Sequence, residues 1–263
     1  MIRLIKMGLA RLMPLQLFGK MFVGYCCLRS RWGCRREALC FLFGMEDEIT
    51  ALVNEHAIAR EGGVHPKHRL TGYHDFFTGR ISAAERVLDA GCGNGAVAFD
   101  VARKTGARVV GVDIDPGHIA EARRRFSHPG VEYRVGDVTV FPGKELFDVV
   151  VLSNILEHIE FRTRFLRELT AGTGAKRFLI RVPCEDRDWR VPLRKELGLE
   201  WRSDRGHFIE YTEAGFREEA AAAGLAVRHL EVRWGEIWAE LIPAVGSQRV
   251  SESASLGAEA GNV

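Results

Sequence analysis

The chain has 263 residues, of which 46% are hydrophobic and 27% charged, and its formal net charge is +2 at pH 7. This length suffices for one sizeable α/β core with appendages. The near-neutral charge gives no overall field that would favour nucleic acid as a partner. The six cysteines show no recognisable zinc spacing, so we expect reduced thiols and a cytoplasmic protein.

The first 45 residues are basic and hydrophobic. Residues 1–36 hold eight Lys and Arg and no acid, and no apolar run in them approaches the roughly twenty residues that span a bilayer. Two interpretations stay open. The segment is either an amphipathic helix in peripheral contact with the inner face of an anionic membrane, or upstream sequence of a protein whose translation starts at Met45.

Residues 46–85 predict a helical lead-in that is rich in histidine. The candidate metal ligands in it are His65, His68, His74 and Asp75. Because Pro66 breaks the first pair and no second pair is obvious, this spacing does not resemble a metal site. We therefore expect no metal, and we predict that His68 and His74 line a polar pocket for the substrate.

The stretch 87–95, Val-Leu-Asp-Ala-Gly-Cys-Gly-Asn-Gly, predicts a buried strand that ends in a glycine-rich turn, followed by a helix over 96–104. Glycines allow a tight bend and let a ligand lie against main-chain N–H groups. The helix adds its positive N-terminal end. We therefore predict a site for a small charged cofactor. Because Gly91-x-Gly93-x-x-Ala96 also fits the relaxed dinucleotide fingerprint, an NAD(P)-dependent oxidoreductase stays an alternative.

Polar residues follow each of the next strands. We predict these strands at residues 108–113, 131–135 and 147–152. The first ends in Asp113, which suits two ribose hydroxyls, the second runs into Asp137, and the third opens onto Ser153. Acids at the ends of the first three strands are more than the binding of NAD requires.

Strands that alternate with helices predict a doubly wound, mostly parallel α/β sheet. Residues 226–234 and 237–243 predict an antiparallel C-terminal hairpin. We expect one domain over 86–246, with an insertion for the substrate at 185–211 after the fifth strand. Residues 247–263 are small and polar and predict a disordered tail.

From Arg86 to Pro243 this series of motifs resembles the class I S-adenosylmethionine-dependent methyltransferases. The stretch 153–159, Ser-Asn-Ile-Leu-Glu-His-Ile, is similar to its counterpart in the ubiquinone-biosynthesis O-methyltransferases. The resemblance implies a seven-stranded Rossmann-like sheet, S-adenosylmethionine as the cofactor, and a lid formed by residues 46–85. By position it implies that the cofactor is bound by Asp89, Gly91, Gly93 and Gly95 at the methionine end, Asp113 at the ribose, Ile114, Asp137 and Val138 at the adenine, and Ser153.

The resemblance also implies methyl transfer to a small polar molecule, and we expect a hydroxyl acceptor that carries a sugar or is associated with lipid. A hydroxyl must lose its proton during the attack, which suits a histidine base. His158, just past the fourth strand, is the first candidate and His207 the second. In the insertion, Trp189 and Tyr211 are further candidates for contact with the acceptor.

Two other features bear on partners. The Asn/Asp-Pro-Pro-Tyr/Phe signature of enzymes that methylate amino groups in nucleic acids is absent after the fourth strand, so we expect no nucleic-acid partner. A non-catalytic module that only binds S-adenosylmethionine would conserve the same binding residues and stays a second alternative. The oligomeric state is left open.

Overall fold

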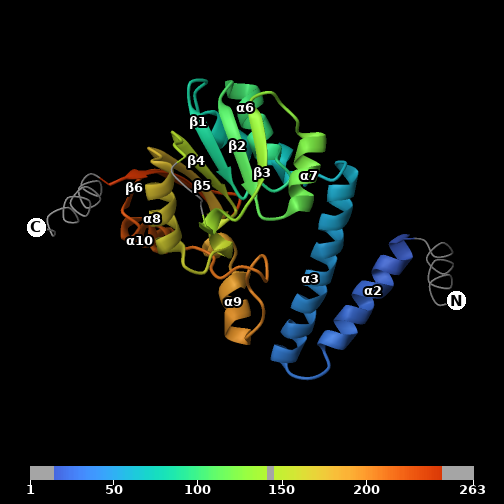
Figure 1. Cartoon of the computed structure of the whole chain (residues 1–263). Coiled ribbons are helices and arrows are strands. Elements are labelled where there is room, and N and C mark those ends of the chain that lie inside the picture. The colour runs from blue at the N-terminus through green and yellow to red at the C-terminus, as the bar shows by residue number, and fades with distance from the viewer. Residues whose placement is uncertain (1–14, 141–144, 245–263) are drawn as a thin grey trace, which may run out of the picture. The chain divides into compact units, whose positions relative to one another are not determined.

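The computed structural model describes residues 15–140 and 145–244, so the predicted tail lies outside the described residues. Its centre is a seven-stranded sheet in the order β3-β2-β1-β4-β5-β7-β6 (Figure 1). The strands are β1 Arg86–Ala90, β2 Arg108–Asp113, β3 Val131–Val135, β4 Val149–Ser153, β5 Arg177–Pro183, β6 Leu225–Arg233 and β7 Glu236–Pro243. β1 to β5 pair in parallel, whereas β7 runs antiparallel to β5 and β6. The predicted Rossmann-like sheet with an antiparallel C-terminal hairpin is confirmed.

The described helices precede the first strand or connect later strands. They are α2 Leu15–Ser30, α3 Arg35–Arg60, α4 Lys67–Leu70, α5 Tyr73–Thr78, α6 Ala96–Thr105, α7 Pro116–Arg125, α8 Arg162–Thr173, α9 Arg190–Leu197 and α10 Glu213–Ala222. The segment directly after β4 forms a single 3-10 turn, Leu156–His158, because Ile159 has an extended backbone and α8 begins only at Arg162. No helix in the described ranges combines the length and hydropathy needed to cross a membrane.

Helices cover both faces of the parallel sheet because successive strand side chains point to opposite sides (Figure 1). Val87 of β1 belongs to a buried cluster that includes Val101 of α6. Its neighbour Leu88 belongs to a second cluster, which includes Leu166 of α8 and Phe216 of α10. The sheet is therefore doubly wound, as predicted.

The described residues fall into two compact units. One comprises 15–66 with Arg194–Leu199, and the other, which contains the sheet, comprises Lys67–Leu193 with 200–244. The predicted division after residue 45 falls inside the continuous helix α3. The last part of the predicted lid, from Lys67 onward, belongs to the unit that contains the sheet.

The strand order reverses between β1 and β4, which lie side by side at the centre of the sheet. Ligands of open α/β sheets bind outside the carboxyl ends of the strands at such a reversal. The glycine-rich turn follows β1, and Ser153 and Asn154 follow the end of β4. Asn154 has a positive φ of 56°, which is uncommon for a residue other than glycine and marks a tight turn. The topology thus places both predicted polar turns at one edge.

Gly95 is required by the fold, which gives a testable prediction. It precedes α6 with a φ of +84°, and a Cβ there would lie 2.7 Å from the Tyr133 hydroxyl and 2.8 Å from the Ala122 side chain. We expect Gly95→Ala to lower the free energy of unfolding by about 2–4 kcal/mol, from backbone strain together with overpacking. Urea unfolding measures this loss.

Gly93 supplies the matched control. Its φ of +53° is also positive, but a Cβ there would meet no atom within 4 Å. Gly93→Ala should therefore cost only about 1–2 kcal/mol of strain. Equal losses in the two variants would contradict the packing role of Gly95.

Candidate functional site

A cavity of about 500 Å³ opens at the carboxyl ends of β1, β2 and β4 and is called here the glycine-turn cavity. Of the residues predicted to bind the cofactor, its lining includes Asp89, Gly91, Gly93, Asp113, Ile114 and Ser153. Two residues predicted on the acceptor side, His68 and His158, also line it. The lining also contains residues for which the sequence indicated no role in binding, namely Lys67, Tyr73, Asn94, His118, Asn154, Ile155 and Arg181.

The Asp113 carboxylate accepts hydrogen bonds from the glycine turn and from the segment that follows β2. The Gly93 backbone N–H donates to its Oδ2 at 2.8 Å, and the Asp115 N–H donates to its Oδ1 at 2.9 Å. Gly93 faces open space, whereas a Cβ on Gly91 would lie 2.5 Å from Ile155 Cδ1. Gly91 is therefore needed for close packing, and Gly93 leaves room for a ligand against the main chain.

Three predicted cofactor residues do not line this cavity. Gly95 packs against Tyr133, and Val138 is buried in the core, so neither residue lines the cavity. Asp137 instead accepts hydrogen bonds from the N–H and hydroxyl of Thr139, at 2.8 and 2.7 Å.

Two buried ionisable groups of opposite charge face the glycine-turn cavity. Asp89 is 2% exposed, and burial, assisted by the negative charge of Asp113, raises its pKa to about 7. Arg181 of β5 is also buried, and its Nε donates to Asn154 Oδ1 at 2.8 Å while the guanidinium lies 3.6 Å from the ring centroid of Tyr73. Among the described residues, neither Asp89 Oδ2 nor Arg181 Nη1 has a hydrogen-bond partner. Both atoms are therefore suited to a bound ligand.

The two predicted bases come together, although they are far apart in the sequence. The Phe208 N–H donates to the Glu157 carbonyl at 2.7 Å, and the rings of His158 and His207 lie edge to face with centroids 4.7 Å apart. The Glu157 carboxylate is fully buried, and burial raises its pKa to about 7. Burial and the neighbouring His207 lower the pKa of the more exposed His158 below its ordinary value. These three side chains offer ligand atoms that all lie within 4.8 Å of one another.

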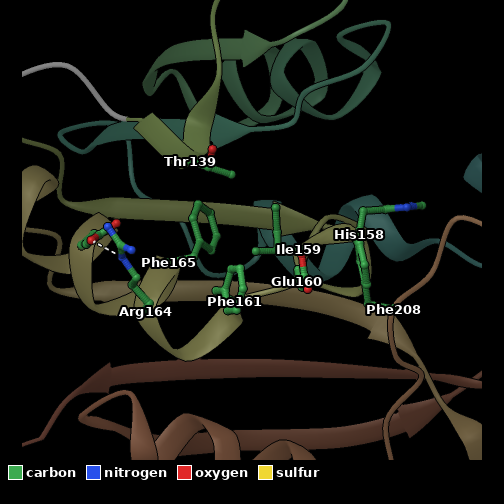
Figure 2. A pocket seen from close by; sticks show the side chains of 9 residues that line it. Thr139, His158, Ile159, Glu160, Phe161, Arg164, Phe165 and Phe208 are labelled. Atoms are coloured by element: carbon green, nitrogen blue, oxygen red, sulfur yellow. Dashed lines mark hydrogen bonds and ion pairs between the residues drawn. The ribbon is translucent and has the colours of Figure 1, made fainter.

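His158 also borders a second cavity of about 390 Å³, called here the aromatic cavity. Figure 2 shows His158 and Phe208 at one end of this cavity and Arg164 at the other, with the rings of Phe161 and Phe165 between them. His158 is thus part of the wall of both cavities. Because charged side chains, Glu160, Arg164 and Glu168, line this cavity together with the aromatic rings, it is suited to a polar organic acceptor.

His68 and His74 are linked to each other. His68 lines the glycine-turn cavity, with its Nδ1 3.0 Å from His74 Nε2 and 2.9 Å from the Tyr73 hydroxyl. His74 is buried behind it, and its Nδ1 lies 2.8 Å from Asp100 Oδ2. His74 therefore positions His68 and is not part of the lining.

The two residues of the insertion predicted to contact the acceptor, Tyr211 and Trp189, line neither cavity. Tyr211 is 1% exposed, and its hydroxyl donates to Glu219 at 2.6 Å, so the prediction that it contacts an acceptor is wrong. Its apolar ring belongs to the core between β5 and α10, which the sequence pattern did not indicate. Trp189 is 72% exposed and lines neither of the two cavities.

Comparison with known proteins agrees with this geometry. Residues 87–173 match a family model described as a methyltransferase domain. A ubiquinone biosynthesis O-methyltransferase from Bradyrhizobium diazoefficiens is 33% identical over 118 residues, which are 44% of this chain and 46% of that protein. A trans-aconitate 2-methyltransferase from Methylobacterium nodulans is 38% identical over 97 residues, 35% of this chain and 37% of that protein. The chain thus spans less than half the length of these two curated relatives.

Solved structures show the same fold. A magnesium protoporphyrin IX methyltransferase from Synechocystis with bound S-adenosylhomocysteine superposes with a TM-score of 0.52, at 18% identity over 68% of this chain and 83% of that chain. A TehB-like S-adenosylmethionine-dependent methyltransferase from Corynebacterium glutamicum gives a TM-score of 0.51, at 19% identity over 75% of this chain and 98% of that chain.

Proposed function

Since the chain belongs to the class I S-adenosylmethionine-dependent methyltransferases, we propose that it transfers a methyl group from that cofactor to a hydroxyl of a small polar acceptor. The observation that carries the proposal is the position of His158 in the wall between the glycine-turn cavity and the aromatic cavity. A residue placed there reaches both the cofactor side and an acceptor. The relatives named for O-methylation and for trans-aconitate support a small-molecule acceptor.

The residues of the glycine-turn cavity fit the cofactor. The methionine end of S-adenosylmethionine carries an ammonium and a carboxylate, and the cavity offers unpaired buried atoms of the complementary kinds on Asp89 and Arg181. Asp113 would hold the ribose hydroxyls, and Ile114, 68% exposed at the cavity, would cover the adenine. A buried polar atom without a hydrogen-bond partner is costly, so a ligand that pairs with Asp89 Oδ2 and Arg181 Nη1 would be stabilised.

The reaction needs an activated methyl group, a positioned acceptor and a group that removes a proton. S-adenosylmethionine supplies a methyl group that its positively charged sulfur has already activated. Holding the acceptor oxygen in line with that methyl group is then the main task of the protein. The acceptor hydroxyl must also lose its proton, and His158, which lines both cavities and has Glu157 and His207 beside it, is the candidate base.

The raised pKa of Asp89 predicts a pH dependence of cofactor binding. With a pKa of about 7, this carboxyl is mostly protonated at pH 6 and mostly ionised at pH 7.5, and only the ionised form pairs with the cofactor's ammonium. We therefore expect binding to release a proton and to tighten by about five- to tenfold from pH 6 to 7.5, where the α-amino group still carries its charge. Calorimetry in two buffers of different ionisation enthalpy measures both effects.

Asp89→Asn is the control for this prediction. Asparagine keeps the size of the side chain but has no charge. The variant should therefore bind the cofactor more weakly than the native protein at pH 7.5, and its affinity should not increase from pH 6 to 7.5. An increase in affinity of the same size in the variant would assign the titration to another group that lines the cavity.

Contact of residues 1–36 with an anionic membrane is a separate part of the proposal. In α2, the described part of this segment, Met21, Val23 and Leu28 are each more than half exposed, and residues 1–36 contain no acid. A basic helix with exposed apolar side chains suits an anionic lipid surface. The protein should therefore sediment with phosphatidylglycerol vesicles and not with phosphatidylcholine vesicles. Failure to sediment with either would reject the contact.

A turnover assay tests the proposed function. The purified chain is incubated with S-adenosylmethionine and small hydroxyl compounds, including catechols, hydroxy acids and sugars, and the formation of S-adenosylhomocysteine is measured. At least one compound should raise this formation above the level without acceptor, and Asp113→Ala should abolish the increase. Tight cofactor binding without turnover on any compound would favour the non-catalytic module.

A further inference from the structure

The geometry points to a binding site for a divalent transition-metal cation, formed by the buried Glu157 and His207 together with His158, which lines both cavities. The sequence spacing gave no indication of this site, because the third ligand lies in the insertion, far along the chain. The inference deepens the proposed function, on which its catalytic part rests. Binding of the cation itself can be tested without turnover.

The first support is the state of the Glu157 carboxylate. The side chain is 0% exposed, and neither of its oxygens has a hydrogen-bond partner among the described residues. A buried carboxylate without a partner carries a large desolvation cost. Because its ligand atom lies within 4.8 Å of nitrogens from two histidines, a cation between the three groups would satisfy it.

The second support is the orientation of the two imidazoles. His207 Nδ1 lies 3.1 Å from Glu210 Oε1, and His158 Nδ1 lies 3.3 Å from the Gly206 carbonyl oxygen. Both partners only accept hydrogen bonds, which places the proton on Nδ1 and leaves the Nε2 lone pair of each ring for a cation. Histidines that bind metals nearly always donate their other N–H to a carboxylate or carbonyl in this way.

The outer partner of His207 is itself held in place. Glu210 is buried, pairs with Arg187 and accepts a hydrogen bond of 2.7 Å from the Ser203 hydroxyl. The Arg187 guanidinium beside it stabilises the negatively charged form of this carboxylate. An ionised partner increases the basicity of the ring it orients.

The donor set indicates which cations fit. Two imidazole nitrogens and one carboxylate suit Zn²⁺, Fe²⁺ or Co²⁺, whereas Mg²⁺ and Ca²⁺ prefer oxygen ligands. Three protein ligands leave a coordination position open, as in catalytic sites. Because His158 borders both cavities, an acceptor hydroxyl could take that position, where the cation would lower its pKa.

The experiment uses untagged protein from which metals have been removed with a chelator. Zn²⁺ is titrated in competition with a chromophoric chelator, and Co²⁺ is followed by its visible absorption. We expect one equivalent of Zn²⁺ to bind and both Glu157→Gln and His207→Asn to weaken binding by more than about 100-fold. The control is His56→Asn on the exposed surface of α3, which should bind as the native protein does.

The result that overturns the inference is the absence of saturable binding near one equivalent, or binding that the two variants leave unchanged. Circular dichroism shows whether the variants fold. If the two buried positions do not tolerate substitution, the more exposed His158→Asn provides the same test. Calorimetry of the metal-free protein with S-adenosylhomocysteine separates the two proposals, because cofactor binding without zinc binding rejects the metal site alone.

Discussion

Asp113→Ala should weaken the binding of S-adenosylhomocysteine by about 100-fold or more. The carboxylate is expected to accept hydrogen bonds from the two ribose hydroxyls, and two charge-assisted bonds of at least about 1.5 kcal/mol each amount to about 3 kcal/mol. The same carboxylate fixes the Gly93 and Asp115 N–H groups, so the substitution also loosens the glycine turn. Calorimetric titration of native and variant protein measures the loss.

Asp115→Asn is the matched control for this prediction. Asp115 is the N-cap of α7 and accepts a hydrogen bond from the Gly117 N–H at 2.7 Å, a bond that asparagine also makes. Its variant should bind within about threefold of the native protein. Comparable affinity in the Asp113 variant and the native protein would reject the assignment of Asp113 to the ribose.

Arg181→Met should lower the free energy of unfolding and weaken the binding of some ligands selectively. The Arg181 guanidinium is buried, and its Nε lies 3.5 Å from Glu236 Oε2. Removing one member of such a pair leaves the other charge without compensation, and we expect a loss of about 3 kcal/mol in the free energy of unfolding. If Nη1 pairs with the cofactor's carboxylate, affinity for S-adenosylhomocysteine should also fall about tenfold or more.

Two controls separate these effects. Arg228→Met removes a 62% exposed arginine that lies 3.4 Å from Glu240, and it should cost less than about 1 kcal/mol. Methylthioadenosine lacks the amino acid end, so Arg181→Met should leave its affinity unchanged. An equal loss for both ligands would mean that Arg181 supports the cavity without contacting the carboxylate.

The sequence was sufficient to predict the fold because the strands are short, apolar and separated by glycine, and because helix and strand periods alternate regularly. β2 and β3 have the predicted bounds, and α6 extends one residue further than predicted. The polar turns after β1 and β4 could be assigned to one site because parallel strands place their carboxyl ends at the same edge.

The rest of the site depends on contacts between distant segments. Arg181 could have been noticed as a basic residue within the apolar run Phe-Leu-Ile-Arg-Val-Pro, since a charge in a buried strand needs a partner or a ligand. The approach of His207 to Glu157 depends on the path of the insertion, which periodicity does not determine. Tyr211 failed as a prediction for the same reason, because its burial is decided by α10 packing onto the sheet.

The shared wall at His158 has a thermodynamic consequence. Because one side chain contributes to both cavities, filling one cavity fixes part of the surface that the other ligand meets. We expect the two binding events to be linked, and by reciprocity a compound that raises the affinity for S-adenosylhomocysteine is itself bound more tightly by the same factor when that product is present. The acceptor can therefore be identified without any methyl transfer, as the compound that changes the affinity measured in a titration with S-adenosylhomocysteine.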